Sequence, residues 1–375
     1  MNHFIKNIHI NKLFHLENFD IPIADEKYPH LIITGKNGSG KTVLLNAITE
    51  SFNNLLREPG IGVLKELFSN KVDVQFFDVE SVIKKYDHHD FIIAFYQADR
   101  KVKMSETKSP TKPVFLHVGI RDTSTYQFLD FLSDLKIQEA LARNENQIQD
   151  ADEIRTWFVE FEKLLQQIFQ DENLKLEFDY KRYFFWINTE GKRFKFTELS
   201  DGFAAALDIV ADLIIKMQVN DSLTRSYQKE GIVLIDEIET HLHLGLQKII
   251  MPLLTQVFPN IQFIVTTHSP FVLSSMPNAV AYDLEHREVL DDLTEYSYES
   301  LAEGYFGVRT QSSYAEMQLE TLRKLLEKEV WTDADKVEIR QLKSDFEKIP
   351  ETVSPLVVGG FRQMMIQNAD KLKSL

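Results

Sequence analysis

The sequence has 375 residues, a hydrophobic fraction of 43%, a formal net charge of −15 and no cysteine. This size allows one large core or two ordinary domains, the missing cysteine excludes disulfides, thiolate metal sites and cysteine nucleophiles, and the net charge should repel nucleic acid. Residues 1–6 lack the apolar run of a signal peptide and no stretch approaches the ~20 apolar residues of a membrane span, so we expect a soluble cytoplasmic protein without membrane contact.

The N-terminal part of the chain predicts strands that lead into a phosphate-binding loop. Residues 3–12 and 19–23 alternate weakly, as two strands would, and the apolar run 31–34 predicts a third strand. Residues 35–42 then complete the motif G-x-x-x-x-G-K-[ST], and residues 42–56 have the period of a helix. In such a strand–loop–helix unit, backbone N–H groups and the helix N-terminus surround a triphosphate.

This loop predicts a site for a nucleoside triphosphate and Mg²⁺. Lys41 would reach the β- and γ-phosphates, and the Thr42 hydroxyl would hold the metal ion. The remaining contacts would come from the loop backbone. The predicted nucleotide-binding residues are Gly35, Asn37, Gly38, Ser39, Gly40, Lys41 and Thr42.

The middle of the chain predicts an inserted lid, because it separates this loop from two later strands that are continuously apolar. Two strands, at 72–77 and 90–96, are predicted before the lid. A loop at 105–113, helices from about 124 to 169, and a β-meander at 174–178, 183–187 and 194–196 follow them.

Polar residues follow the two late strands, which cover residues 232–235 and 261–266. Asp236 and Glu237 come directly after the first strand, and His268 lies in the turn after the second. At the sheet edge that carries the phosphates, Asp236 would orient the Mg²⁺ shell and Glu237 would hold the attacking water as general base. His268 would contact the γ-phosphate and sense its loss.

A second anion-binding tip is predicted before the helix at 204–217, where Ser200 and Gly202 precede the helix N-terminus. Another helix is predicted over 242–257, and the chain beyond about residue 299 has a mostly helical pattern.

Together these motifs resemble the ABC-type ATPases, and within them the SMC-like soluble branch. The signature of that branch is similar to Leu199, Ser200, Asp201 and Gly202; the next position varies in the branch, so we expect no specific side-chain role for Phe203. The stretches 236–243 and 258–270 look closely like the prokaryotic OLD-like AAA ATPases, which are common as the ATPase half of anti-phage defence systems, with Leu244 where that family usually has Pro. Gln97 lies where the family has its Q-loop.

The resemblance implies an α/β fold with an ABC-type P-loop ATPase head, a helical lid and β-meander insertion, and a helical C-terminal segment. It implies ATP and Mg²⁺ as cofactors, with Thr42, Asp236 and Gln97 at the metal. In the family, ATP is clamped between two heads, so residues 199–202 would complete the site of a partner subunit in a homodimer or higher homo-oligomer. The expected divisions are 1–105 and 191–285 for the two parts of the ATPase core, 106–190 for the lid and meander, and 286–375 for the C-terminal region.

Several sequence features have two interpretations. Glu303 with Asp333 and Asp335 mimics fragments of a TOPRIM nuclease, but these residues lie on helical stretches, and Thr332 to Asp335 is better explained as a helix cap with an acidic first turn. Two basic segments could contact nucleic acid locally, although a solvated loop and a hairpin edge are the favoured explanations. These segments are Arg100, Lys101, Lys103, Lys108 and Lys112, and Lys181, Arg182, Lys192, Arg193 and Lys195.

We therefore expect an SMC-like ATPase that hydrolyses ATP in head-to-head dimers and acts with a separate effector, such as a nuclease, toxin or reverse transcriptase, in a prokaryotic defence system. Two alternatives stay open. One is a DNA-repair or chromosome-associated ATPase that binds DNA directly, and the other is a nucleotide-gated scaffold with little turnover. A transporter subunit is disfavoured by the soluble-branch signature.

Overall fold

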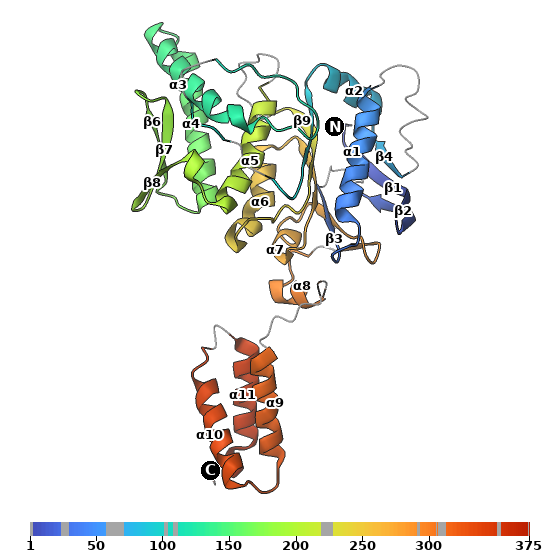
Figure 1. Ribbon diagram of the computed structural model, residues 1–375, viewed down its shortest axis with the longest axis vertical. Coiled ribbons are helices and arrows are strands. Elements are labelled where there is room, and N and C mark those ends of the chain that lie inside the picture. Colours follow the sequence, from blue (N-terminus) through green and yellow to red (C-terminus); the bar gives the residue numbers. More distant parts are fainter. Residues whose placement is uncertain are drawn as a thin grey trace. The chain divides into compact units, whose positions relative to one another are not determined.

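The computed structural model describes residues 3–23, 30–57, 71–100, 104–107, 112–218, 228–290, 293–304, 306, 313–350, 354–373 and 375. The chain divides into two compact units, Met1–Tyr296 and Ser297–Leu375, and each has a hydrophobic core of its own (Figure 1). The finer divisions expected at residues 105, 190 and 285 stay predictions.

A six-stranded sheet forms the centre of the first unit, in the order β12-β11-β3-β10-β9-β5. The strands from β11 to β5 are parallel, and β12 is antiparallel to β11. Strands covered on both faces need apolar side chains at every position, which explains the continuous apolar runs. The strands are β3 (His30–Thr34), β5 (Phe91–Tyr96), β9 (Glu230–Ile235), β10 (Ile261–Thr266), β11 (Ala279–Asp283) and β12 (Glu288–Leu290).

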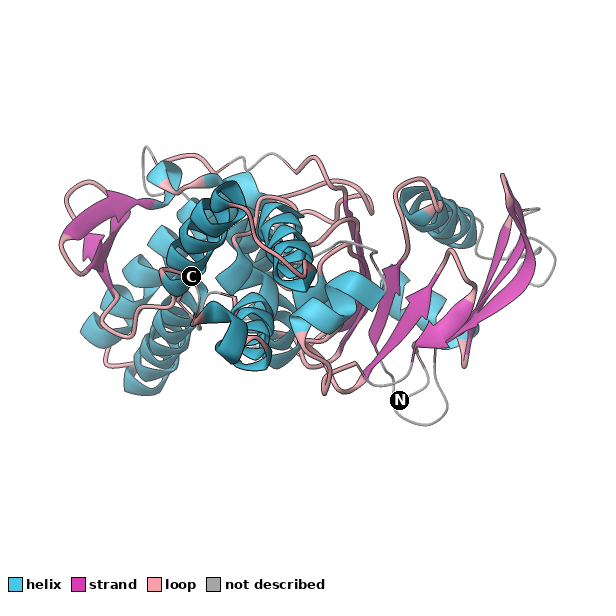
Figure 2. Ribbon diagram, turned by 90° about the horizontal axis from the view of Figure 1, so that it is seen from below, coloured by secondary structure: helices cyan, strands magenta, loops and turns pink. Residues whose placement is uncertain are grey.

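A three-stranded antiparallel sheet and helix α1 (Lys41–Arg57) cover one face of the central sheet (Figures 1 and 2). The strands are β1 (Ile5–Leu13), β2 (Leu16–Pro22) and β4 (Val72–Phe76), and α2 (Val79–Asp87) follows them. Leu44, Ile48 and Phe52 of α1 are buried in a core that takes side chains from both sheets. This packing fixes the helix whose first turn carries the phosphate-binding loop.

Helices cover the other face of the central sheet, and the predicted lid lies beyond them (Figure 1). The covering helices are α5 (Asp201–Lys216), α6 (Leu244–Val257) and the short α7 (Pro270–Leu273). The lid consists of α3 (Phe128–Asn144), α4 (Ile148–Phe169), β6 (Lys175–Asp179), β7 (Phe184–Thr189) and β8 (Lys192–Lys195). The α/β fold class, the helices of the lid and the antiparallel meander are all confirmed.

The second unit is helical, as predicted. It contains α8 (Tyr298–Gly304), α9 (Ser313–Glu327), α10 (Asp333–Glu347), α11 (Pro355–Gln367) and α12 (Ala369–Leu372). Thr332 and Asp335 form a reciprocal capping box at the start of α10, which confirms the cap interpretation of the acidic residues there. Among the described helices of either unit, none is long and apolar enough to cross a membrane.

Candidate nucleotide-binding site

The phosphate-binding loop joins β3 to α1 and is wrapped around its own lysine. Gly38 (φ 84°) and Gly40 (φ 103°) have backbone angles that other residues rarely adopt. Lys41 is buried, and its Nζ donates to the carbonyl oxygens of Gly35 at 2.8 Å and Lys36 at 3.2 Å. The buried Ser39 hydroxyl has no hydrogen-bond partner among the described residues. The loop therefore holds an ammonium group and a hydroxyl group that could donate hydrogen bonds to an anion.

Asp236 connects this loop to the two late strands. The Thr42 hydroxyl donates to Asp236 Oδ2 at 2.8 Å, and the hydroxyl of Thr266, at the end of β10, donates to Oδ1 at 2.7 Å. The backbone N–H of Glu237 donates to the same Thr266 hydroxyl at 2.8 Å. Asp236 is 2% exposed, and the carboxyl edge of the parallel sheet brings it to Thr42 although 194 residues separate the two.

A strained turn follows Asp236. Glu237 has φ 43° and His241 has φ 69°, which is uncommon for residues other than glycine and is often found at functional sites. The carboxylate of Glu239 ties this turn to the next strand, because it accepts the Thr267 hydroxyl at 2.8 Å and the His268 N–H at 2.5 Å. Burial raises the pKa of Glu239 from its ordinary value.

The surroundings of His268 and Lys41 shift the pKa of each side chain. Burial, followed by the positive charge of Lys41, lowers the pKa of His268, so its imidazole is neutral at pH 7. Burial also lowers the pKa of Lys41, while the carboxylates of Glu237, Glu239 and Asp236 oppose that shift. The carboxylates around the loop therefore favour the charged form of Lys41.

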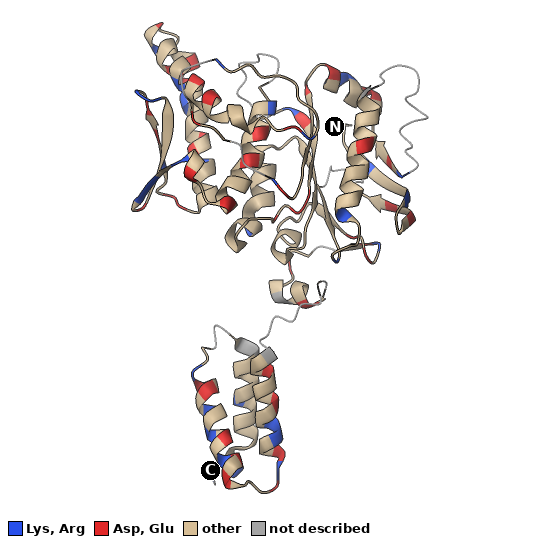
Figure 3. Ribbon diagram, in the orientation of Figure 1, with Lys and Arg blue, Asp and Glu red and all other residues tan. Residues whose placement is uncertain are grey.

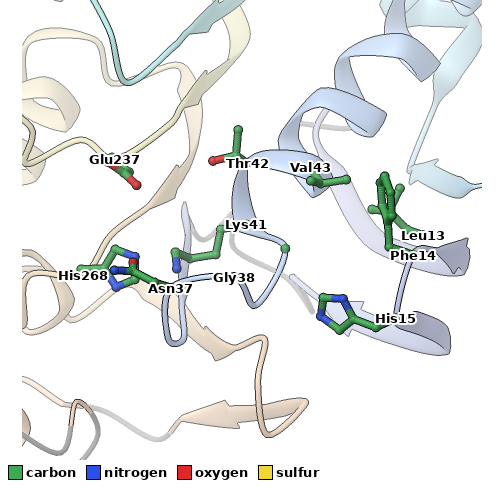
Figure 4. A pocket seen from close by; sticks show the side chains of 11 residues that line it. Leu13, Phe14, His15, Asn37, Gly38, Lys41, Thr42, Val43, Glu237 and His268 are labelled. Atoms are coloured by element: carbon green, nitrogen blue, oxygen red, sulfur yellow. The ribbon is translucent and has the colours of Figure 1, made fainter.

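These groups line one pocket of about 340 Å³. Figure 4 shows Lys41 and Thr42 at the middle of this pocket, with Glu237 and His268 on one side and Leu13, Phe14 and His15 at the other end. Its volume lies within the range of about 300–1,000 Å³ that is usual for small-molecule sites. The structure thus brings the predicted residues Lys41, Thr42, Glu237 and His268 together.

The far wall of this pocket was not predicted. Phe14 lies in the tight turn between β1 and β2 with φ 57°, and its side chain is 78% exposed. His15 Nε2 is 3.2 Å from the Ser39 carbonyl oxygen, and Arg287 Nη2 donates to the His15 carbonyl at 3.2 Å. Phe14 itself was the signal in the sequence that could have indicated this wall. An aromatic side chain in a short hairpin turn has no structural purpose there, so it suggests a contact with a ligand.

The predicted signature begins α5. Ser200 is the N-cap, is exposed, and its hydroxyl makes no capping hydrogen bond. Asp201 is also exposed, and a Cβ on Gly202 would lie 2.9 Å from the His241 carbonyl oxygen. The signature therefore packs against the strained turn of its own subunit.

The expectation that Phe203 has no specific side-chain role is wrong. Its ring stacks on Phe169 at the end of α4, with centroids 4.3 Å apart, and lies edge-on to His243 at 5.2 Å. Phe203 therefore links the signature to the lid and to the turn before α6, where the His243 ring accepts the Leu246 N–H as a helix cap. This cap is also why α6 begins at Leu244, two residues later than predicted.

The first basic segment is not a continuous surface patch. Lys101, Lys103 and Lys108 lie outside the described residues. Arg100 is directed into the protein, where its guanidinium donates to backbone carbonyls that include that of Asp236 at 3.1 Å. Gln97 is exposed, next to Tyr96, whose carbonyl accepts the Asp236 N–H at 2.8 Å, so Gln97 lies at the expected sheet edge and its metal role stays a prediction.

In the second basic segment, Lys181 and Arg182 lie between β6 and β7, and Lys192, Arg193 and Lys195 lie on β8; Figure 3 shows Lys and Arg on this meander. Arg193 pairs with Glu177 at 2.9 Å and lies over the Trp186 ring, and Lys195 pairs with Glu106 at 2.7 Å. These pairs occupy the charges of Arg193 and Lys195 within the subunit, which favours the hairpin-edge explanation for β8.

Residues 109–274 match a protein family described as "AAA domain, putative AbiEii toxin, Type IV TA system". The match covers a little under half of the chain and includes the lid, the predicted signature, Asp236, Glu237 and His268. The phosphate-binding loop lies before it.

Two curated relatives share different extents of the chain. The Septu protein PtuA of Bacillus mycoides is 26% identical over 317 residues, which are 76% of this chain and 41% of that protein. The Retron Vc95 probable ATPase of Vibrio cholerae is 41% identical over 87 residues, which are 23% of this chain and 17% of that protein. The chain thus spans about two fifths of the length of the first relative and less than a fifth of the second.

Among solved structures, the SMC head domain from Thermotoga maritima is similar at 16% identity with a TM-score of 0.37, over 74% of this chain and 94% of that chain. The family match and the curated relatives confirm the resemblance inferred from the motifs. The chain is thus similar to this AAA-domain family over residues 109–274 and has relatives among the Septu and retron proteins.

Proposed function

We propose that this protein binds ATP in the pocket of Figure 4 and hydrolyses it with Glu237 as the general base. The observation that carries the proposal is the order of groups along that pocket. Phosphate-binding donors lie in the middle, and a carboxylate and a neutral imidazole lie on one side of them, where the terminal phosphate would be attacked.

The residues present fit Mg²⁺ and a triphosphate. The Thr42 hydroxyl and the Asp236 carboxylate already touch, and hydroxyl and carboxylate oxygens are ligands that Mg²⁺ prefers. Bound there, Mg²⁺ would neutralise charge that develops on the β- and γ-phosphate oxygens. Thr42 and Asp236 would hold it, with Gln97 as a further candidate at the same sheet edge.

Lys41, Glu237 and His268 would each have a different role in hydrolysis. Lys41 Nζ would exchange the carbonyls of Gly35 and Lys36 for phosphate oxygens, which satisfies the ammonium equally well and adds charge complementarity. The Glu237 carboxylate would orient a water molecule and accept its proton as that water attacks the γ-phosphorus. Neutral His268 would donate one hydrogen bond to the terminal phosphate.

The base of the nucleotide would lie at the other end of the pocket. Leu13, Phe14 and His15 line that end, and the exposed Phe14 ring offers a face on which a purine can stack. The contact between His15 and the Ser39 carbonyl fixes this wall against the phosphate loop.

We further propose that two subunits close on ATP, with residues 199–202 of each completing the site of the other. The exposed N-terminus of α5 supports this role, since Ser200 is not used as a capping side chain and helix N-termini favour anions. The pairing of two subunits is inferred from the resemblance of the motifs and not from a contact within one subunit.

The similarity to Septu and retron proteins supports a role in anti-phage defence as part of this proposal. We propose that the ATP state of the dimer controls a separate effector chain such as a nuclease, toxin or reverse transcriptase. Capture with Glu237→Gln from the native host, in ATP and Mg²⁺, tests this proposal. A stoichiometric effector supports it, whereas retained nucleic acid without a second protein would favour a DNA-repair role.

The enzymatic part of the proposal is tested by measuring ATP affinity and steady-state phosphate release together. Lys41→Ala should lose ATP binding, because Nζ is the buried ammonium around which the loop is folded. Glu237→Gln should keep ATP affinity and lose turnover. Lys163→Ala and Glu160→Gln, which alter an exposed ion pair on α4, are the matched controls and should behave as wild type. Equal turnover in wild type and Glu237→Gln would refute the assigned base, and a wild type with no turnover would indicate a scaffold.

A further inference from the structure

Arg100 makes an unusual set of contacts behind the pocket. It lies four residues beyond the end of β5, and its side chain reaches the turn that carries Glu237. Nη1 donates to the carbonyl oxygens of Gln97 at 3.3 Å and Asp236 at 3.1 Å. Nη2 donates to those of Glu237 at 3.5 Å and Ile238 at 3.3 Å. One guanidinium therefore holds three successive carbonyls of the turn.

The turn needs such support because its backbone is strained. Glu237 has φ 43°, and a left-handed residue persists only where its surroundings determine it. The N–H groups of Glu237 and Ile238 are bound on the β10 side, by the Thr266 hydroxyl at 2.8 Å and the Thr266 carbonyl at 3.1 Å. Arg100 binds the carbonyls of the same residues, so the two sets of contacts fix the peptide planes from which the Glu237 side chain projects.

Arginine suits this position by charge as well as by geometry. Burial lowers the pKa of Arg100, and the carboxylates of Asp208, Glu239 and Asp236 oppose that shift, so the group stays protonated. Asp208 belongs to α5, the helix that begins at the predicted signature. One turn further along α5, Asp212 accepts the hydroxyl of Tyr96, the last residue of β5, at 2.7 Å. The charged face of α5 thus lies against the segment that carries Arg100.

We propose that Arg100 is a positioning residue for ATP hydrolysis, which holds the Glu237 turn in its attacking geometry through the carbonyls of residues 236–238. The inference rests on the proposed function, since it assigns Arg100 a part in the same reaction. Arg100 does not line the nucleotide pocket, so its loss should leave ATP affinity intact.

The test compares Arg100→Ala and Arg100→Lys with Arg121→Ala as the matched control. Arg121 also packs against β5, with its guanidinium 4.8 Å from the Phe95 ring, and donates to Asn46 Oδ1 at 2.6 Å, but it makes no contact with the Glu237 turn. Arg100→Ala should lower kcat about a hundredfold, the cost of a displacement near 1 Å at a reacting group, with the ATP dissociation constant unchanged within about threefold. Arg100→Lys should be intermediate, because an ammonium cannot span three carbonyls.

Guanidinium ions at non-denaturing concentrations give a readout that a purely structural role would not move. They should restore part of the turnover of Arg100→Ala, by refilling the site between the carbonyls, and leave Arg121→Ala unchanged. A kcat within about twofold of wild type in both Arg100 variants would overturn this inference alone. Parallel losses of ATP affinity, melting temperature and kcat without rescue would also overturn it. A wild type that fails to hydrolyse ATP would overturn the proposed function and this inference together.

Discussion

Removal of the Thr266 hydroxyl tests how much its two hydrogen bonds stabilise the site. Thr266 is 0% exposed, and its hydroxyl donates to Asp236 Oδ1 at 2.7 Å and accepts from the Glu237 N–H at 2.8 Å. Thr266→Val keeps the shape and removes both contacts. A hydrogen bond to a charged group contributes about 1.5–3 kcal/mol, and a buried N–H left without a partner costs about 1–3 kcal/mol. With partial relaxation, we expect a combined loss of about 3 kcal/mol.

Thermal unfolding without nucleotide measures this loss. A cost of about 3 kcal/mol should lower the melting temperature of the first unit, Met1–Tyr296, by about 5 °C. Thr266→Ser is the control, because it keeps the hydroxyl and loses only a methyl group, at about 1 kcal/mol. Turnover should fall in Thr266→Val and persist in Thr266→Ser, since Glu237 loses its backbone anchor only in the former. Equal melting temperatures and equal turnover in the two variants would refute the reasoning.

Two further predictions concern α5. Burial raises the pKa of Asp208 from 3.8 to about 6, so between these values the folded protein binds a proton that the unfolded chain does not, and stability falls as pH rises through that window. Asp208→Asn should therefore gain stability relative to wild type between pH 4 and pH 7, by at most about 3 kcal/mol, and a melting-temperature difference that does not vary with pH would contradict this. Gly202→Ala should weaken ATP-dependent dimerisation and leave ATP affinity unchanged, because the added Cβ would lie 2.9 Å from the His241 carbonyl oxygen and displace the signature. The mass in solution measures dimerisation. A Gly202→Ala protein that dimerises as well as wild type would contradict this prediction.

The elements nearest the chemistry were predictable, since their residues obey local rules. A glycine-rich loop between a strand and a helix has a recognisable motif, and two buried strands that end in acids or histidine must place them at one sheet edge. The loop, β9 and β10 were found on these grounds, and Lys41, Thr42, Asp236 and His268 do lie together.

The features that were missed depend on contacts distant in sequence. Strand β11 pairs with β3, about 250 residues earlier, and its short sequence Ala-Val-Ala-Tyr-Asp gives no strong local signal. Phe203 finds its partner Phe169 on the lid, which no motif of α5 encodes. Arg100 belongs to a run of basic residues that suggests a solvated loop, and only the fold turns its side chain toward the carbonyls after β9.

The mass of Glu237→Gln in solution with ATP and Mg²⁺ tests the central claim most directly, since it asks whether ATP joins two subunits at this pocket. One subunit has a mass of 43.6 kDa. We predict twice that mass with one ATP bound per subunit, return to the monomer mass in ADP, and a monomer in ATP when Ser200→Arg is added. A Glu237→Gln protein that binds ATP fully and stays at 43.6 kDa would contradict the account.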